Sequence, residues 1–170
     1  MKNNIIFILL LLVVIGCAAA KPAVWMEKGV SLSGYKVFEV MPVSNETGKT
    51  FEFDVANELT QHIKSKLKDK GYIISEEKKA VEGVLIIKSS LIVYEPGSAF
   101  KRWILTGLGK TQCTLKTSLV DKKTGKVLGE MLAAEEVSSG GLYSIEADKW
   151  ILNVVAKSIS DEIDRKVKGE

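Results

Sequence analysis

Apolar residues recur along the chain at two spacings, and these predict two helices and a sheet. Over residues 51–70, and again from residue 144 to about 168, they recur every three or four positions, the period of a helix with one buried stripe. The predicted buried positions are Ala56, Leu59, Ile63 and Leu67 in the first helix, and Trp150, Ile151, Val154, Val155, Ile159, Ile163 and Val167 in the second. Ser144 and Gly71 stand where an N-terminal and a C-terminal cap are expected.

Short runs rich in β-branched and alternating apolar residues predict the strands. They cover residues 35–43, 72–75, 81–94, 110–121 and 126–138, and the last two form a hairpin around the turn at residues 121–125. On the long strand we expect Leu85, Ile87, Leu91 and Val93 to share the buried face. This order predicts an α+β domain, with a mixed, mostly antiparallel sheet of about four main strands and two long helices packed on it.

The start of the chain follows another pattern. Lys2 precedes an uninterrupted apolar run over residues 5–15, and the sequence Val14-Ile15-Gly16-Cys17 ends it. A basic start, a short apolar stretch and small residues at a cut site are typical of a secretory signal. The last four residues resemble the bacterial lipobox, in which the cysteine thiol receives a diacylglycerol and the chain is cut before it. The resemblance implies lipidation of Cys17.

The N-terminal sequence predicts how the chain is divided and where in the cell the protein is located. We expect residues 1–16 to be a lipoprotein signal peptide, residues 17–34 a lipidated cysteine and tether, and residues 35–170 a single domain. Ala18 resembles the residue found in lipoproteins that are passed to the outer membrane of Gram-negative cells, where the domain would face the periplasm. The alternative is an uncleaved membrane helix, although the sixteen apolar residues 5–20 fall short of the ~20 that a spanning helix needs.

Composition narrows the class of protein. Removing residues 1–16 takes away one charge, Lys2, and changes the net charge from +3 to +2, which does not favour a nucleic-acid partner. The remaining 154 residues are enough to bury a core without a disulfide or a metal. With Cys17 lipidated, Cys113 is the one remaining cysteine, and Leu115 and Leu119 on its strand face predict a buried, unreactive thiol.

Several segments carry a resemblance to a bacterial lipoprotein family. They are Ala80-Val81-Glu82-Gly83-Val84, Tyr94-Glu95-Pro96-Gly97-Ser98-Ala99, Arg102-Trp103, Gly107-Leu108-Gly109, Asp121 and Thr124-Gly125-Lys126-Val127-Leu128. From residue 37 to about 166 the chain resembles the family known as domain of unknown function 4410, except that Lys110 stands where the family usually has a small residue. More distantly, it is similar to small α/β domains of envelope-assembly lipoproteins. These resemblances imply a binding or assembly role and bring no catalytic residues.

The residues that could indicate nucleotide binding, metal binding or catalysis do not form complete motifs. Gly48-Lys49-Thr50 and Gly109-Lys110-Thr111 resemble the end of a phosphate loop, but Val43 and Ile104 occupy the places of its first glycine, so we expect no nucleotide. His62 is the only histidine, which disfavours a zinc site or a serine triad. Glu135 and Glu136 are adjacent on a predicted strand, so they point to opposite faces. We therefore expect no cofactor, no metal and no enzyme activity.

The composition of one segment suggests more than a structural role. Residues 100–109 lie between two predicted strands, where surface residues should be polar, yet most of them are apolar or basic. We expect a contact with a partner or the membrane through Phe100, Arg102, Trp103, Ile104, Leu105 and Leu108. The alternative is that this stretch folds back to close the core or begins the next strand.

These observations favour a non-enzymatic, lipid-anchored binding or assembly module of the cell envelope, with the membrane and an envelope protein as partners. Two alternatives stay open: a periplasmic enzyme with carboxylate chemistry, and a carrier of a small apolar ligand. A deep cleft with two converging carboxylates would favour the enzyme, and a closed apolar cavity would favour the carrier.

Overall fold

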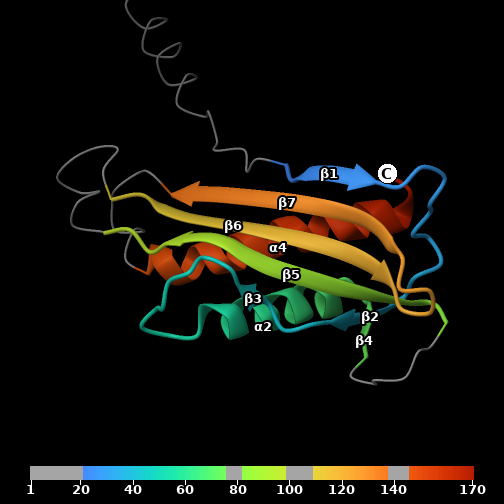
Figure 1. Cartoon of the computed structure of the whole chain (residues 1–170), viewed down its shortest axis with the longest axis horizontal. Coiled ribbons are helices and arrows are strands. Elements are labelled where there is room, and N and C mark those ends of the chain that lie inside the picture. The colour runs from blue at the N-terminus through green and yellow to red at the C-terminus, as the bar shows by residue number, and fades with distance from the viewer. Residues whose placement is uncertain (1–20, 76–81, 99–108, 138–145) are drawn as a thin grey trace, which may run out of the picture.

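The computed structural model describes residues 21–75, 82–98, 109–137 and 146–170, which form one mixed sheet of seven strands and two helices (Figure 1). The strands are β1 (Ala23–Met26), β2 (Val37–Val40), β3 (Ser44–Asn45), β4 (Ile73–Ile74), β5 (Val84–Glu95), β6 (Thr111–Asp121) and β7 (Val127–Val137). The helices are α2 (Val55–Asp69) and α4 (Ala147–Lys168). The α+β prediction is therefore confirmed.

The sheet has more strands, and more parallel pairs, than the sequence predicts. Its order is β1-β7-β6-β5-β2-β4, and β3 pairs with β5 beside this path. The contacts β1–β7, β7–β6 and β6–β5 are antiparallel, whereas β2 is parallel to β4 and β5, and β3 is parallel to β5. Four main strands was too low because β1 and β3 were not expected: they have four and two residues, too few to show an alternation in the sequence.

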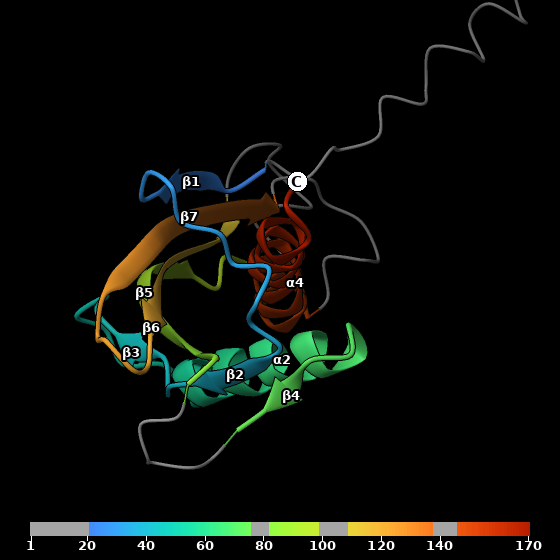
Figure 2. The ribbon, with the colours of Figure 1, turned by 90° about the vertical axis from the view of Figure 1, so that its right-hand side faces the viewer.

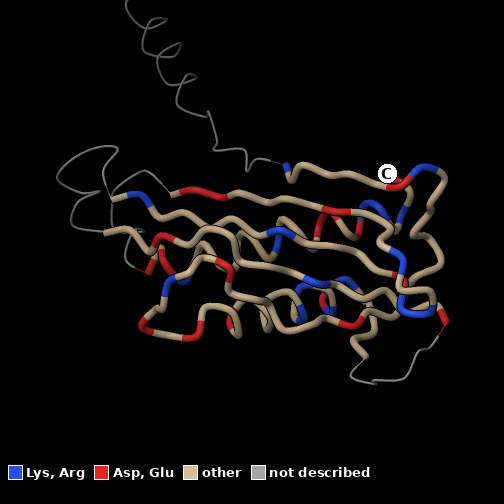
Figure 3. Tube along the Cα trace, in the orientation of Figure 1, with Lys and Arg blue, Asp and Glu red and all other residues tan. Residues whose placement is uncertain are grey.

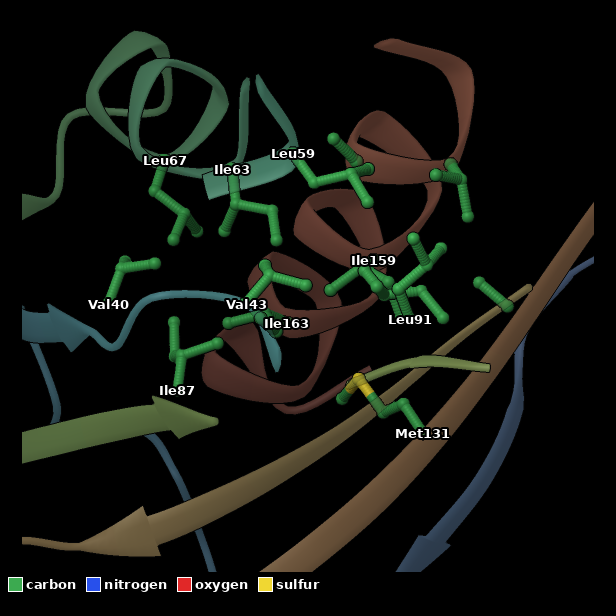
Figure 4. Packing of buried hydrophobic residues seen from close by; sticks show 14 of the residues in the cluster. Val40, Val43, Leu59, Ile63, Leu67, Ile87, Leu91, Met131, Ile159 and Ile163 are labelled. Atoms are coloured by element: carbon green, nitrogen blue, oxygen red, sulfur yellow. The ribbon is translucent and has the colours of Figure 1, made fainter. Parts of the chain in front are cut away.

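Both helices lie on the concave face of the curved sheet, and the described residues place no helix on the opposite face (Figure 2). The core lies between them, and Figure 4 shows α2, α4 and the strands contributing side chains to it. Leu59, Ile63 and Leu67 of α2 are fully buried there, as predicted, while Ala56 is half-buried. Through these buried side chains the two helices pack against each other and against the concave face of the sheet.

The ends of α2 follow from local hydrogen bonds. The carboxylate of Asp54 accepts from the backbone N–H of Asn57 and caps the helix start, so α2 begins four residues later than predicted. Gly71 has φ +87°, and its N–H donates to Lys68 while Tyr72 donates to Leu67. These two bonds form the glycine-dependent C-terminal motif that the sequence predicts.

The second helix confirms most of its predicted stripe. Ile151, Val155, Ile159 and Ile163 are fully buried. Trp150 was wrongly assigned to the core, since 58% of it is exposed, and Val154 is only half-buried. The buried positions recur every four residues from Ile151, and Trp150 lies about 100° around the helix from that line. The predicted cap Ser144 lies outside the described residues.

A network of polar groups holds α4 to the end of α2. Asp164 accepts from the Tyr72 hydroxyl at 2.7 Å and from Lys168 at 2.8 Å, and the Lys70 ammonium lies 3.6 Å away. Burial acts to raise the pKa of Asp164, but the bonds from Lys168 and Tyr72 and the charge of Lys70 outweigh it, so the pKa lies below its ordinary value. Asp164 is therefore ionised in the folded protein.

The buried face of β5 differs from the prediction at its end. Leu85, Ile87 and Leu91 are fully buried, but Val93 is only half-buried and Tyr94 takes the next core position. The register with β6 shifts between Leu91 and Val93, as in a β-bulge, and the extra residue reverses the alternation. Val93 was thus wrongly predicted because its sequence gives no sign of the bulge.

The folded part of the chain also begins before residue 35. β1 pairs with the edge of β7, and Leu32 is buried in the core with 1% of its surface exposed. The hydroxyl of Tyr35 donates to Asp121 at 2.8 Å. The prediction of a tether over residues 17–34 is therefore wrong from Ala23 onward, because this segment docks on the sheet and fills part of the core.

Candidate functional site

The predicted contact residues lie outside the described part of the chain. Cys17 falls within residues 1–20, and Phe100, Arg102, Trp103, Ile104, Leu105 and Leu108 fall within residues 99–108. The structure does describe the residues on both sides of the second segment. The Ser98 N–H donates to the Gly109 carbonyl at 3.0 Å, and the Thr111 hydroxyl donates to Pro96 at 2.9 Å. These flanking residues therefore lie next to one another, where β5 finishes and β6 begins.

Aromatic rings cluster at that end of the sheet. The rings of Phe51 and Phe53 meet Tyr94 edge-on, with centroids 4.9 and 6.4 Å apart. The Tyr94 hydroxyl donates to the backbone carbonyl of Asp148 at 3.0 Å, which joins β5 to the first turn of α4. Burial raises the pKa of Tyr94, with the charge of Asp148 adding to it, so this phenol stays protonated.

An open groove of about 400 Å³ lies beside this cluster, along the connection from β3 to α2. Its lining runs from Asn45 through residues 50–56 and includes both Phe51 and Phe53. The Lys149 ammonium lies 6.0 Å from the centre of the Phe53 ring, and Trp150 beside it is exposed. The groove is a shallow surface with aromatic and charged edges rather than an enclosed cavity.

A second open groove of about 530 Å³ lies at the other end, beside the β6–β7 turn. Its two carboxylates are already engaged: Glu82 pairs with Lys123 at 2.9 Å, and Asp121 accepts from Tyr35 and Thr124. The bonds from Thr124 and Tyr35 lower the pKa of Asp121, and burial followed by the bond to Asp121 raises the pKa of Tyr35 to about 12. Neither Asp121 nor Tyr35 therefore has a pKa suited to proton exchange near neutral pH.

The Glu135 carboxylate lies on the concave side of the sheet, beside a cysteine. Cys113 and Glu135 are cross-strand partners, and Cys113 is fully buried, as predicted. Burial, followed by the charge of Glu135, raises the pKa of the Cys113 thiol to about 12, which keeps it protonated and unreactive. Glu136 points the other way and pairs with Lys110 at 2.8 Å, so the predicted separation of the two glutamates is confirmed.

A further apolar patch lies on the outer face of the sheet. We call Ala23, Trp25, Leu132 and Ala134 the β1–β7 patch; Trp25 is 55% exposed and Leu132 is 44% exposed. In the register Ala23 faces Leu132 and Trp25 faces Glu130, so their side chains share the face away from both helices. Trp25 is the diagonal neighbour of Leu132, which is within reach of an aromatic side chain.

The register also explains why β1 can lie so close to β7. A Cβ added at Gly129 would overlap the Met26 sulfur and come 2.9 Å from the Trp25 carbonyl oxygen. The second contact is to backbone, which cannot turn aside as a side chain can. Glycine at this position therefore makes room for β1.

Two further findings concern the described residues alone. Within them, no group of three or more His, Cys, Asp or Glu side chains is placed to hold a metal ion. None of the helices they form has the length and apolar character needed to cross a membrane.

The fold has counterparts among solved structures. A point variant of PelC from Paraburkholderia phytofirmans, solved as a dodecamer, is 14% identical, with a TM-score of 0.56, over 81% of this chain and 96% of PelC. The hypothetical protein CT253 from Chlamydia trachomatis is 13% identical, with a TM-score of 0.53, over 79% of this chain and 96% of CT253. At these identities the likeness concerns the fold alone.

Comparison with curated proteins finds no match. Comparison with protein families does find one: residues 40–141 match the family described as Domain of unknown function (DUF4410). The matched residues run from the end of β2 to beyond the end of β7 and include both sides of the segment at 99–108. The chain therefore belongs to the DUF4410 family of domains of unknown function.

Proposed function

We propose that this protein is a lipid-anchored module of the bacterial cell envelope that binds or assembles with other proteins and has no enzyme activity. The observation that carries the proposal is the sequence at Val14–Cys17, which resembles a lipobox directly after a secretory signal. A diacylglycerol on Cys17 supplies two acyl chains, enough for stable anchoring where a single chain holds only marginally. In a Gram-negative cell the anchor lies in the outer membrane, with the domain in the periplasm.

The fold and its surface support a binding role over catalysis. The two grooves described above are open rather than enclosed, and the carboxylates of the groove at the β6–β7 turn are committed to structural bonds. PelC, which shares the fold at a TM-score of 0.56, is described as a dodecamer. This supports assembly as the kind of work for which the fold is suited.

The contact with a protein partner is made by Phe100, Arg102, Trp103, Ile104, Leu105 and Leu108. Aromatic and arginine side chains dominate the binding energy of protein interfaces, and this segment combines them within nine positions. The described residues on either side of the segment lie at the end of the sheet that carries the Phe51–Phe53–Tyr94 cluster. The partner would therefore meet this end of the domain.

The test is crosslinking in the native envelope, with partners identified by mass spectrometry. We expect the wild-type chain to give a defined crosslinked complex, either with another envelope protein or with further copies of itself. Changing Phe100 and Trp103 together to serine should remove the complex and leave the melting temperature within a degree or two. Intact crosslinks in a stable double variant would refute the contact, and a large loss of stability would show that the segment belongs to the core.

A further inference from the structure

We infer that the β1–β7 patch rests on the surface of the lipid bilayer, so that the domain lies along the membrane with one edge of its sheet against it. This inference rests on the proposed lipidation of Cys17 and goes beyond it, because lipidation alone does not fix which surface of the domain faces the membrane. Three observations carry it: the length of the tether, the exposed side chains and the distribution of charge.

The length of the tether sets how far the domain can move from its anchor. β1 begins at Ala23 and is paired to β7, so only six residue steps separate Cys17 from the folded part. Fully extended, six steps span at most ~22 Å. A tether reaching to residue 34 would span up to ~60 Å and would leave the domain free to turn in any direction. The docking of β1 removes that freedom and keeps its edge of the sheet near the headgroups.

The exposed side chains nearest the anchor are suited to a membrane interface. Trp25 and Leu132 are both about half exposed and lie on the outer face of the sheet, beside the strand where the tether ends. Tryptophan is enriched at membrane–water interfaces because its ring is apolar and its N–H is polar. β1 is an edge strand of the sheet in Figure 1, so no other described strand separates it from the bilayer.

The charges around β1 agree with a lipid surface. Two ion pairs lie there, Lys126 with Glu27 at 2.7 Å and Lys116 with Glu130 at 3.3 Å. Lys21 and Lys28 flank β1 and add positive charge beyond these pairs. A small excess of lysine beside apolar side chains favours binding to anionic headgroups.

The end of the domain that carries the aromatic cluster has the opposite balance of charge, with more acidic residues than lysines. In the β3–α2 connection and the first turn of α4 the acidic residues are Glu46, Glu52, Asp54, Glu146 and Asp148, and the lysines are Lys49 and Lys149. Figure 3 shows acidic positions gathered around the start of α2 and α4 at this end. Anionic lipid would repel this described surface, so the edge at β1 is favoured over the end that carries Trp150.

The proposal is tested with a fluorescent probe on single introduced cysteines in the lipidated chain, reconstituted into vesicles that contain anionic lipid and a spin-labelled lipid quencher. Cys113 is fully buried and Cys17 carries lipid, so neither takes the label in the folded protein. The variant Leu132→Cys reports on the β1–β7 patch, Ile73→Cys on β4 at the opposite edge of the sheet, and Trp150→Cys on the acidic end. All three positions are exposed, so circular dichroism should show the same fold in each.

We expect the probe at residue 132 to shift to shorter wavelength and to be quenched by the lipid severalfold more than the probes at residues 73 and 150. Equal quenching at the three positions, or stronger quenching at residue 150, would overturn the inference. A blue-shifted probe at residue 132 without lipid quenching would show that another copy of the chain covers the patch, which also overturns it. Mass spectrometry of Cys17 in the same samples separates these outcomes from a failure of the proposed function, in which the cysteine carries no lipid.

Discussion

The substitution Leu32→Ala tests whether the segment after β1 is part of the cooperative fold. Leu32 is 1% exposed and packs in the core cluster, although the sequence around it has the character of a tether. Shortening the side chain removes three carbons from the core, a loss of ~2.4 kcal/mol at ~0.8 kcal/mol for each. The cavity left behind adds to this, so we expect a decrease of about 2–5 kcal/mol in the free energy of unfolding.

The measurement is urea unfolding of the lipidated chain in detergent micelles, followed by tryptophan fluorescence. The matched control is Leu132→Ala, the same chemical change at a side chain that is 44% exposed, and it should cost less than about 1 kcal/mol. Equal and small effects of the two substitutions would refute the assignment of residues 28–34 to the folded domain.

Three other predictions concern the helices, β1 and acid stability. Ile159→Ala should lower the free energy of unfolding by about 2–5 kcal/mol, whereas Trp150→Ala should change it by no more than about 0.5, and equal losses would refute the packing of α4. Gly129→Ala should displace β1, seen as faster proteolysis near residue 28, and an unchanged digestion pattern would contradict the close contact. Because the pKa of Asp164 is lowered on folding, its stabilising effect is complete above the unfolded pKa of about 3.9 and is lost as the pH falls through the lower folded value. The urea midpoint should therefore fall less steeply below pH ~4 in Asp164→Asn than in the wild type, and parallel curves would contradict this role.

The elements with many turns or many residues were predictable because their patterns repeat. The stripe Leu59, Ile63 and Leu67 repeats over three turns of α2, and the β6–β7 hairpin combines long alternating strands with a turn sequence of the right kind. Gly71 was predictable as a cap because the left-handed conformation there favours glycine. Each of these features depends on residues close together in the chain.

The errors arise where the structure depends on partners distant in sequence. The four residues of β1 gain their strand conformation from β7, more than a hundred positions later, and their own sequence is too short to show it. The bulge near Val93 becomes visible only in the register with β6. Trp150 is apolar and one position from the buried line of α4, so the sequence pattern alone does not exclude it from the core.

The candidate functional residues also separate into those suggested by local sequence and those that depend on partners distant in sequence. Cys17 is proposed from a local motif that needs no fold, and the segment at 100–108 from a composition unusual for a strand connection. The β1–β7 patch could not be found in this manner, because Trp25 and Leu132 come together only through the pairing of two strands. The described part of the fold thus adds a surface that neither segment suggests by itself.

The most direct test of the account is mass spectrometry of the N-terminal peptide of the protein purified from bacterial membranes. The account predicts that residues 1–16 are absent and that the peptide begins at Cys17, with its thiol joined to a diacylglycerol. A peptide that retains residues 1–16 and has a free thiol at Cys17 would contradict it, because the domain would then be held by an uncleaved apolar segment instead of by lipid.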